Sequence, residues 1–405
     1  MGESRDWASL ESGPLHDVFT RLTADLDAFN FRHVCRGWSA AAGAGALIPR
    51  PWFVLRSATD GHCAFVRPTA GRRRRRSRVK NVRVGAPCVR GASRGWLALD
   101  DGGGRLLLRD PISRAEVPLP SFDDPAYRLS DVFLSDDPLA APAGRWTAFA
   151  FFKTENCAYG YPGKVLAFCR PDDAEWGRFD LDGDGQQVGF YRGLEFFRGR
   201  AYVLLGMYML AVCDVEARRV VACPVALQHM MEWESIQVSL VECGGNLLVA
   251  AVSQYEYATS SYCVRHRVVR RFLARVVKID FEEAIGGAGM PVGLSNLEGG
   301  IGDYALFVAP QGHAFALPVR GFPAVRPGCV YHFAASITTK SVSGMVVTEL
   351  LGQDPTKVQD DPLRKLPLAA GGAGWRLGCW FCPRSPSLET TPARRRRGTL
   401  RLSYK

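Results

Sequence analysis

Two different spacings of apolar residues divide the chain near residue 50. Between residues 5 and 46 the apolar residues recur three and four positions apart, as on one face of an α-helix, in two groups: Leu15, Val18, Phe19 and Leu22, then Phe31, Val34, Cys35 and Trp38. Stripes this short do not hold a helix together in water unless they pack against each other. We therefore predict a small all-α helical bundle over residues 5–46.

From Pro51 onward the apolar residues form short runs, which are separated by turns rich in glycine and proline. Residues 96–99 and 106–108, joined by an Asp-Gly-Gly-Gly turn, have the pattern of a β-hairpin. Similar runs continue to about residue 383 without a long helical pattern between them. Many short strands indicate a β-sandwich, barrel or propeller, and about 350 residues are too many for one ordinary sandwich.

A short internal repeat favours the propeller. An Arg-Gly turn is followed by an Asp-x-x-x-Arg segment twice in the sequence, at 94–95 with 110–114 and at 198–199 with 214–218. Blades of about 45 residues would give about six to eight repeats. We therefore predict an all-β propeller over residues 51–383, followed by a disordered basic tail over residues 384–405.

The net charge of +11 comes from two segments of the chain. Residues 61–99 contain eleven basic residues and no acidic residue, and residues 391–405 add six more, so the remainder is slightly acidic. The densest run is a nuclear import signal, a phosphate-binding patch or a solvated loop, and it consists of Arg72, Arg73, Arg74, Arg75, Arg76, Arg78 and Lys80. No aromatic residue interrupts this run. Base stacking is therefore not favoured, and we do not expect a nucleic-acid partner.

Composition excludes two broad classes of protein. An apolar content of 47% is too high for a chain that is disordered throughout. The longest uncharged apolar run, 202–213, is shorter than the about 20 residues that span a bilayer. The twelve cysteines are scattered, mostly within apolar runs, where a reduced cysteine behaves as a small hydrophobe. We expect a soluble protein of the cytoplasm, the nucleus or both, without a membrane partner.

No motif in the sequence points to catalysis, a metal or a cofactor. The acidic segment 180–185 begins like a calcium loop, but its twelfth position is Tyr191 where a bidentate acid is needed. Cys379 and Cys382 form a CxxC pair without a second ligand pair nearby, so we expect buried thiols there. The seven histidines form no metal-binding or catalytic pattern. We predict that the chain is not an enzyme and needs no cofactor.

The helical segment resembles an F-box. The residues that fall in register with the F-box pattern are Trp7, Leu10, Leu15, Val18, Phe19, Leu22, Asp27, Phe29, Phe31, Val34, Cys35 and Trp38. The rest of the chain resembles plant F-box proteins that carry a KIB-type β-propeller. That likeness rests on Pro51-Trp52, Ser93-x-Gly95-Trp96-Leu97, Asp110-Pro111 with Leu119-Pro120, Gly302-Asp303-x-Ala305-Leu306-Phe307, and Phe322-Pro323 ahead of 329–333.

The resemblance implies an adaptor that performs no chemistry itself. In such proteins the F-box binds the Skp-type subunit of an SCF ubiquitin ligase, and the propeller holds a target protein whose identity the sequence does not reveal. The residues that the resemblance assigns to the Skp-type subunit are Leu10, Pro14, Leu15, Val18, Leu22, Phe31, Val34, Cys35 and Trp38.

Two positions of the helical segment depart from the family pattern. The usual Leu-Pro is Leu10-Glu11 here, and Pro14 replaces the apolar residue that opens the first helix. The alternative interpretation is therefore a propeller scaffold for protein–protein interaction, with a degenerate F-box and no ligase.

Overall fold

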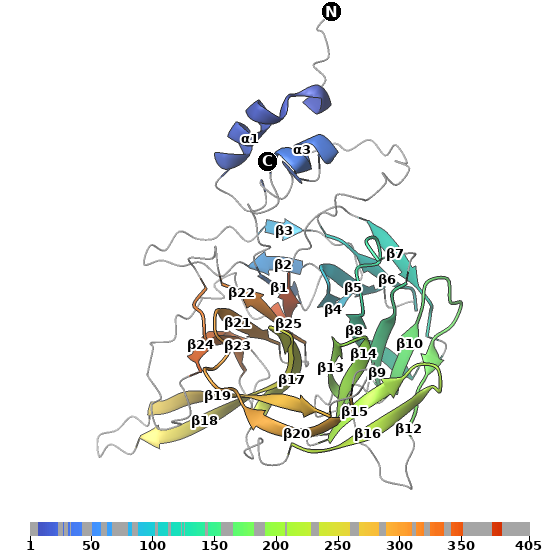
Figure 1. Cartoon of the computed structure of the whole chain (residues 1–405), viewed down its shortest axis with the longest axis vertical. Coiled ribbons are helices and arrows are strands. Elements are labelled where there is room, and N and C mark those ends of the chain that lie inside the picture. The colour runs from blue at the N-terminus through green and yellow to red at the C-terminus, as the bar shows by residue number, and fades with distance from the viewer. Residues whose placement is uncertain are drawn as a thin grey trace, which may run out of the picture.

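The computed structural model shows a ring of β-sheets with a small helical segment above it (Figure 1). It describes residues 7–22, 27, 31–32, 34–42, 51–57, 63–66, 80–82, 88–101, 104–111, 115–122, 124, 126–141, 145–154, 165–181, 191–206, 209–227, 235–259, 267–282, 289–309, 313–319, 325–335, 342–350 and 375–382. The strands within these ranges form six sheets, which we number in chain order from β1. The tail 384–405 lies outside the described residues.

Sheets one to three have four strands each. Sheet one consists of β25 (Trp375–Phe381), β1 (Trp52–Ser57), β2 (Cys63–Val66) and β3 (Lys80–Val82). Sheet two consists of β4 (Cys88–Ser93), β5 (Trp96–Asp100), β6 (Leu106–Arg109) and β7 (Glu116–Leu119). Sheet three consists of β8 (Tyr127–Leu134), β9 (Ala148–Thr154), β10 (Val165–Cys169) and β11 (Gly177–Arg178).

Sheets four to six continue the ring. Sheet four consists of β13 (Tyr191–Phe197), β14 (Arg200–Leu205), β15 (Met209–Asp214) and β16 (Arg219–Ala226), with β12 (Asp180–Leu181) added at its edge. Sheet five consists of β17 (Ser235–Cys243), β18 (Asn246–Thr259), β19 (Arg267–Phe281) and β20 (Pro291–Asn296). Sheet six has the order β22 (Ala314–Pro318), β21 (Tyr304–Val308), β23 (Cys329–Ala335) and β24 (Val342–Glu349).

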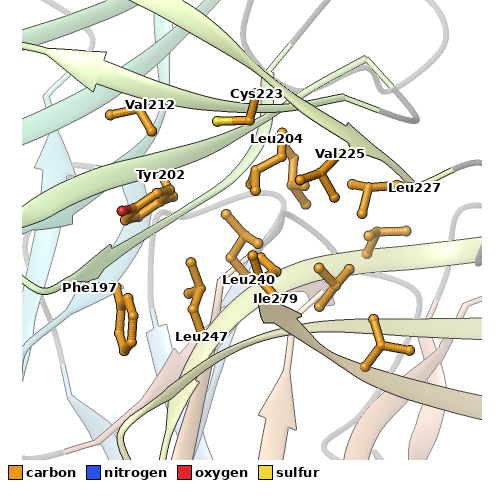
Figure 2. Close-up of a cluster of buried hydrophobic side chains, with 14 of the residues drawn as sticks. Phe197, Tyr202, Leu204, Val212, Cys223, Val225, Leu227, Leu240, Leu247 and Ile279 are labelled. Atoms are coloured by element: carbon orange, nitrogen blue, oxygen red, sulfur yellow. The ribbon is translucent and has the colours of Figure 1, made fainter. Parts of the chain in front are cut away.

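Each pair of neighbouring sheets encloses its own apolar core, which explains why the strands are almost continuously apolar. In β14, Tyr202 and Leu204 face sheet five, whereas Ala201, Val203 and Leu205 face sheet three. Successive side chains of a strand point to opposite faces, so a strand buried on both faces shows no polar alternation. Figure 2 shows the core between sheets four and five, where Leu204 of β14 and Leu240 of β17 are labelled. Packing of this kind on both faces of every sheet is the architecture of a β-propeller.

The first and last described strands close the ring. β25 pairs with β1 in antiparallel register, with Phe53 opposite Trp380. The Trp380 side chain is buried, packs against Phe307 and Phe333 of sheet six, and donates an indole hydrogen bond to the Val308 carbonyl (3.1 Å). Residues more than 300 positions apart in sequence therefore share sheet one, and the indole fastens that sheet to sheet six.

The predicted propeller is confirmed. The two copies of the internal repeat occupy equivalent places, because Arg94 and Arg198 both have positive φ in the turns β4–β5 and β13–β14. Six sheets in the described residues lie within the expected range of repeats. In sheets two and five the strands follow one another in chain order. Sheet six differs, since β22 takes the innermost position and β21 runs parallel to β23.

The helical segment contains a short 3-10 helix η1 (Trp7–Ser9) and the α-helices α1 (Ser12–Thr20) and α3 (Arg36–Ala41). α1 packs against α3, and a separate apolar core joins them: Leu15, Phe19, Phe31, Ala41 and Ala42. We refer to residues 7–42 as the helical segment. Whether it is an independent domain with the predicted 5–46 boundary stays a prediction.

Candidate functional site

Three aromatic rings hold the helical segment together. The Phe31 ring lies 5.2 Å from Phe19 and 4.6 Å from Trp38, measured between ring centroids. The Trp38 indole N–H donates to the carbonyl of Trp7 (2.9 Å), which fixes the start of the segment against α3. Leu15 and Phe31 are buried as core residues, and the Leu22 and Trp38 side chains are half-buried against this core. Four of the nine predicted docking residues therefore stabilise the segment.

Four other predicted docking residues lie on the surface. Leu10, Val18 and Val34 are 39%, 49% and 50% exposed, and Pro14 is exposed as well. Pro14 and Val18 are four residues apart in α1, so they share one face of the helix. Trp7, which was not among the nine, is 60% exposed. The ninth residue, Cys35, is half-buried.

The helical periodicity therefore predicted that more of each helix face is buried than the structure shows. It placed Val18 and Val34 with the core residues, whereas both side chains are about half exposed. The spacing of three and four residues covers a broad face of a helix, and a core of two short helices is too small to cover all of it. Large apolar side chains that remain exposed on so small a segment are typical of a protein-binding surface.

The start of α1 tolerates the two departures from the family pattern. Glu11 is the N-cap residue in an extended conformation, and its side chain makes no capping hydrogen bond. The helix begins at Ser12, which places Pro14 in its first turn, where a backbone N–H has no helical partner to lose. Both residues are exposed, so they alter the surface of the segment and not its core.

Only the last residue of the predicted import run lies within the described residues. Lys80 is the first residue of β3, while Arg72–Arg76 and Arg78 lie outside the described residues. The import hypothesis for this run stays a prediction.

The innermost strands of four successive sheets each carry a bulge. The pairing register shifts between Val89 and Gly91 in β4, between Leu129 and Asp131 in β8, between Tyr191 and Leu194 in β13, and between Ser235 and Gln237 in β17. A bulge redirects the side chain that follows it. Two of these positions carry buried polar residues, Asp131 and Gln237.

Asp131 meets His313 at the centre of the ring, where sheets three and six lie on opposite sides. The Asp131 Oδ1 atom is 3.1 Å from His313 Nε2, and both residues are buried. The imidazole also stacks on Phe133, with centroids 4.0 Å apart. Gly91 of β4 leaves room for this contact, because a Cβ atom there would lie 3.2 Å from both partner atoms. Both residues are too deeply buried to touch a protein partner directly.

Glu195 of β13 is another ionisable group of the propeller, and its pKa is shifted. Burial raises the pKa of Glu195 to about 7, although the N–H of Phe196, the charge of Arg94 and the N–H of Glu242 each oppose the shift. The Phe196 N–H donates to the carboxylate at 2.9 Å. No pattern in the sequence points to Glu195 or to the central pair. Asp131 and His313 are 182 positions apart, and no local pattern connects them.

Most of the described cysteines are buried, but Cys88 is exposed, and of the predicted pair of buried thiols only one is fully covered. Cys379 is buried, Cys382 is half-buried, and neither is in a disulfide. Burial raises the pKa of the Cys223 and Cys243 thiols to about 11, which keeps them protonated and unreactive near neutral pH. Within the described ranges, no three His, Cys, Asp or Glu side chains are grouped so that they could hold a metal ion. None of the described helices has the length and apolar character to cross a membrane.

Comparison with known proteins defines the class of the propeller. The sequence model of the KIB1-4 β-propeller family matches residues 65–348, which is more than half of the chain. The chain therefore belongs to the KIB1-4 β-propeller family, and a propeller of this type suggests protein–protein interaction.

A solved structure is also similar over part of the chain. YCF48 from Cyanidioschyzon merolae aligns with a TM-score of 0.28 and 15% identity. The alignment covers 42% of this chain and 51% of that one, so this chain spans about half the length of its match. No curated protein matches the chain in sequence.

Proposed function

We propose that the chain is the substrate-recognition adaptor of an SCF-type ubiquitin ligase. In this proposal the helical segment binds the Skp-type subunit, and the propeller binds a target protein in the cytoplasm, the nucleus or both. The adaptor itself performs no chemistry. One observation carries the proposal: Leu10, Pro14, Val18 and Val34, at positions where the F-box resemblance predicts contact, are exposed on a segment with its own core.

The division between buried and exposed residues supports this role. Leu15, Phe19 and Phe31 supply the core, so the exposed apolar residues are not needed to fold the segment. Burying a fully exposed side chain of this size contributes about 1.5–3 kcal/mol, and these side chains are about half covered already, so each contributes about half of that. Several such contacts together favour association with a partner that covers them.

The alternative is a propeller scaffold that binds partners without a ligase. Glu11 and Pro14 favour it, because both are exposed where the family presents proline and a leucine-sized residue. A carboxylate loses solvation when a partner covers it, and a shorter ring leaves apolar contact unmade.

Titration of the purified Skp-type subunit against variants of the full chain distinguishes the two functions. Val18→Glu is expected to weaken binding by at least about tenfold, since about 1.4 kcal/mol is enough for that change. The matched control is Val292→Glu on β20, because Val292 is equally exposed (51%) but lies on the propeller. The double change Glu11→Pro with Pro14→Leu is expected to tighten binding by at least about tenfold.

Each outcome has a definite meaning. Equal affinities for the wild type and the double variant would place Glu11 and Pro14 outside the interface. Equal losses in Val18→Glu and Val292→Glu would show that the measured contact is not specific to the helical segment. Binding by neither the wild type nor the double variant would favour the ligase-free scaffold.

A further inference from the structure

Two exposed arginines near the turn between β13 and β14 lie where sheets four and five meet. The Arg198 guanidinium lies 5.0 Å from the centroid of the Phe197 ring and 5.3 Å from that of Phe281, the last residue of β19. Arg200 begins β14 opposite Phe197, and its Nη1 atom lies 3.8 Å from the sulfur of Met290. The two guanidinium groups are therefore positioned by rings and a thioether.

Neither arginine is neutralised by a carboxylate of the described residues. Of the ion pairs among those residues, none includes Arg198 or Arg200. The Asp214 carboxylate, at the end of the neighbouring strand β15, instead accepts the backbone N–H of Ala217 (2.9 Å). A thioether is a weak acceptor, and stacking on a ring uses the face of a guanidinium but leaves its N–H edge free. Both arginines therefore keep donors for a ligand.

A buried hydroxyl group without a partner lies beside the two arginines. Tyr202 is fully buried, and its hydroxyl makes no hydrogen bond within the described part of the chain (Figure 2). Its ring packs edge-on against Phe281, with centroids 5.7 Å apart, and it shares one face of β14 with Arg200. Burial raises the pKa of Tyr202, whereas the charges of Arg200 and Arg198 oppose that shift. The hydroxyl is therefore a protonated donor within the field of both guanidinium groups.

These three donors together fit an oxyanion. Burial of an unpaired hydroxyl is unfavourable, so an acceptor oxygen that reaches Tyr202 adds a hydrogen bond without breaking one. Guanidinium groups bind phosphate and carboxylate oxygens through charge-assisted hydrogen bonds, which are stronger where apolar side chains exclude water. Arg200 gives up only its weak contact with the Met290 sulfur when it turns toward such a ligand.

We propose that Arg198, Arg200 and Tyr202 bind a single oxyanion group, a phosphate or a carboxylate, on a side chain of the target protein. This inference rests on the proposed function only in that the propeller holds a target. The site differs from the two basic segments of the sequence, because a buried hydroxyl and two aromatic rings accompany its charges.

The methyl group of Met290 provides a local signal for the experiment. The full chain is labelled with carbon-13 at its methionine methyl groups, and Met290→Leu assigns the signal in the NMR spectrum. Inorganic phosphate, phosphoserine blocked at both ends and glutamate blocked at both ends are titrated separately, with chloride as the reference at constant ionic strength. We expect a saturable shift of the Met290 signal at millimolar concentrations of at least one blocked amino acid.

Variants assign the binding to the three donors. Arg198→Gln and Arg200→Gln are each expected to weaken binding by at least about tenfold, because each removes a charged donor. Tyr202→Phe is expected to weaken it by at least about threefold without lowering the temperature of thermal unfolding, because the hydroxyl has no hydrogen bond to lose. The control Arg105→Gln with Arg145→Gln removes two exposed arginines elsewhere on the propeller, and it is expected to leave the affinity within about twofold.

The two blocked amino acids identify the source of the oxyanion. Tighter binding of phosphoserine would assign the site to a phosphorylated side chain, and tighter binding of glutamate would assign it to a carboxylate.

Several outcomes would overturn the proposal. A shift with inorganic phosphate but with neither amino acid would indicate an adventitious ion only, and the absence of any saturable shift would remove the site. Equal losses in the control would show that binding follows net charge. A Tyr202→Phe chain that is less stable but binds equally well would give the hydroxyl a structural role instead. Binding of the Skp-type subunit is expected to be unaffected in all variants, so failure of this site and failure of the adaptor function are read separately.

Discussion

Two ionisable groups of the propeller, His332, which is buried, and Glu195, which is half-buried, are expected to oppose each other in the pH dependence of stability. Burial lowers the pKa of His332 on β23 from 6.5 to about 3, and its Nε2 lies 2.8 Å from Thr348 Oγ1. Burial raises the pKa of Glu195 on β13 from 4.5 to about 7. The folded state therefore resists protonation of His332 and favours protonation of Glu195.

The signs follow from proton linkage. Below pH 6.5 the unfolded chain binds a proton at His332 that the folded chain does not bind, so acidification from pH 7 to pH 5 removes about 2 kcal/mol of stability. Below pH 7 the folded chain binds a proton at Glu195 that the unfolded chain binds only near pH 4.5. The same acidification therefore adds about 1–2 kcal/mol, after allowance for the partial exposure of Glu195. The two effects nearly cancel in the wild type.

Single substitutions separate the two contributions. Free energies of unfolding from urea titrations at pH 7, 6 and 5 are compared with the wild type at each pH. Glu195→Gln is expected to lose about 1–2 kcal/mol relative to the wild type between pH 7 and pH 5, and His332→Gln to gain about 2 kcal/mol. His16→Gln, a substitution in the helical segment outside the propeller, serves as the control. Parallel pH profiles for the wild type and both variants would refute the reasoning, because neither group would then titrate differently on folding.

Three further substitutions test the centre, the closure and the helical segment. Gly91→Ala is expected to cost about 1–3 kcal/mol, since the added methyl group crowds the central contact, and thermal unfolding measures it. Trp380→Ala is expected to cost about 3–5 kcal/mol and to expose the last strand to protease first, as the indole fastens sheet one to sheet six. Phe31→Ala should unfold the helical segment alone, because Phe31 is buried in its core. Val34→Asp should leave the segment folded, because Val34 is half exposed. Limited proteolysis distinguishes the two variants, since only the first should be cleaved rapidly before Pro51.

Local patterns predicted much of the propeller because its hairpins are local. The runs around Trp96, Ala201 and Leu247 became strands where apolar residues met glycine turns, and both copies of the Arg-Gly repeat mark the same kind of turn. Burial on both faces makes each strand conspicuous in sequence. The short strands β3, β11 and β12 carry too few residues for such a pattern to be recognised.

Contacts between distant segments were not predictable from these patterns. Pairing of β25 with β1, the exchanged order of β21 and β22, and the contact of Asp131 with His313 all depend on how the ring closes. The register in which β18 and β19 continue beyond their neighbours likewise follows from pairing and not from composition. For the helical segment, periodicity identified the core residues, but it could not separate Leu15, which is covered, from Val18, which is not.

Closure of the ring determines how the two parts of the chain depend on each other. β1 lies between β25 and β2 in sheet one, so its backbone hydrogen bonds are satisfied on both sides within the propeller. Among the described residues, the core that covers β1 consists of Trp52 and Val54 with residues of sheet two and β25, and it includes none from the helical segment. The described residues of the helical core likewise all come from the helical segment. Changes to the exposed residues of the helical segment are therefore expected to alter partner binding without opening the propeller, as the proposed adaptor with two partners requires.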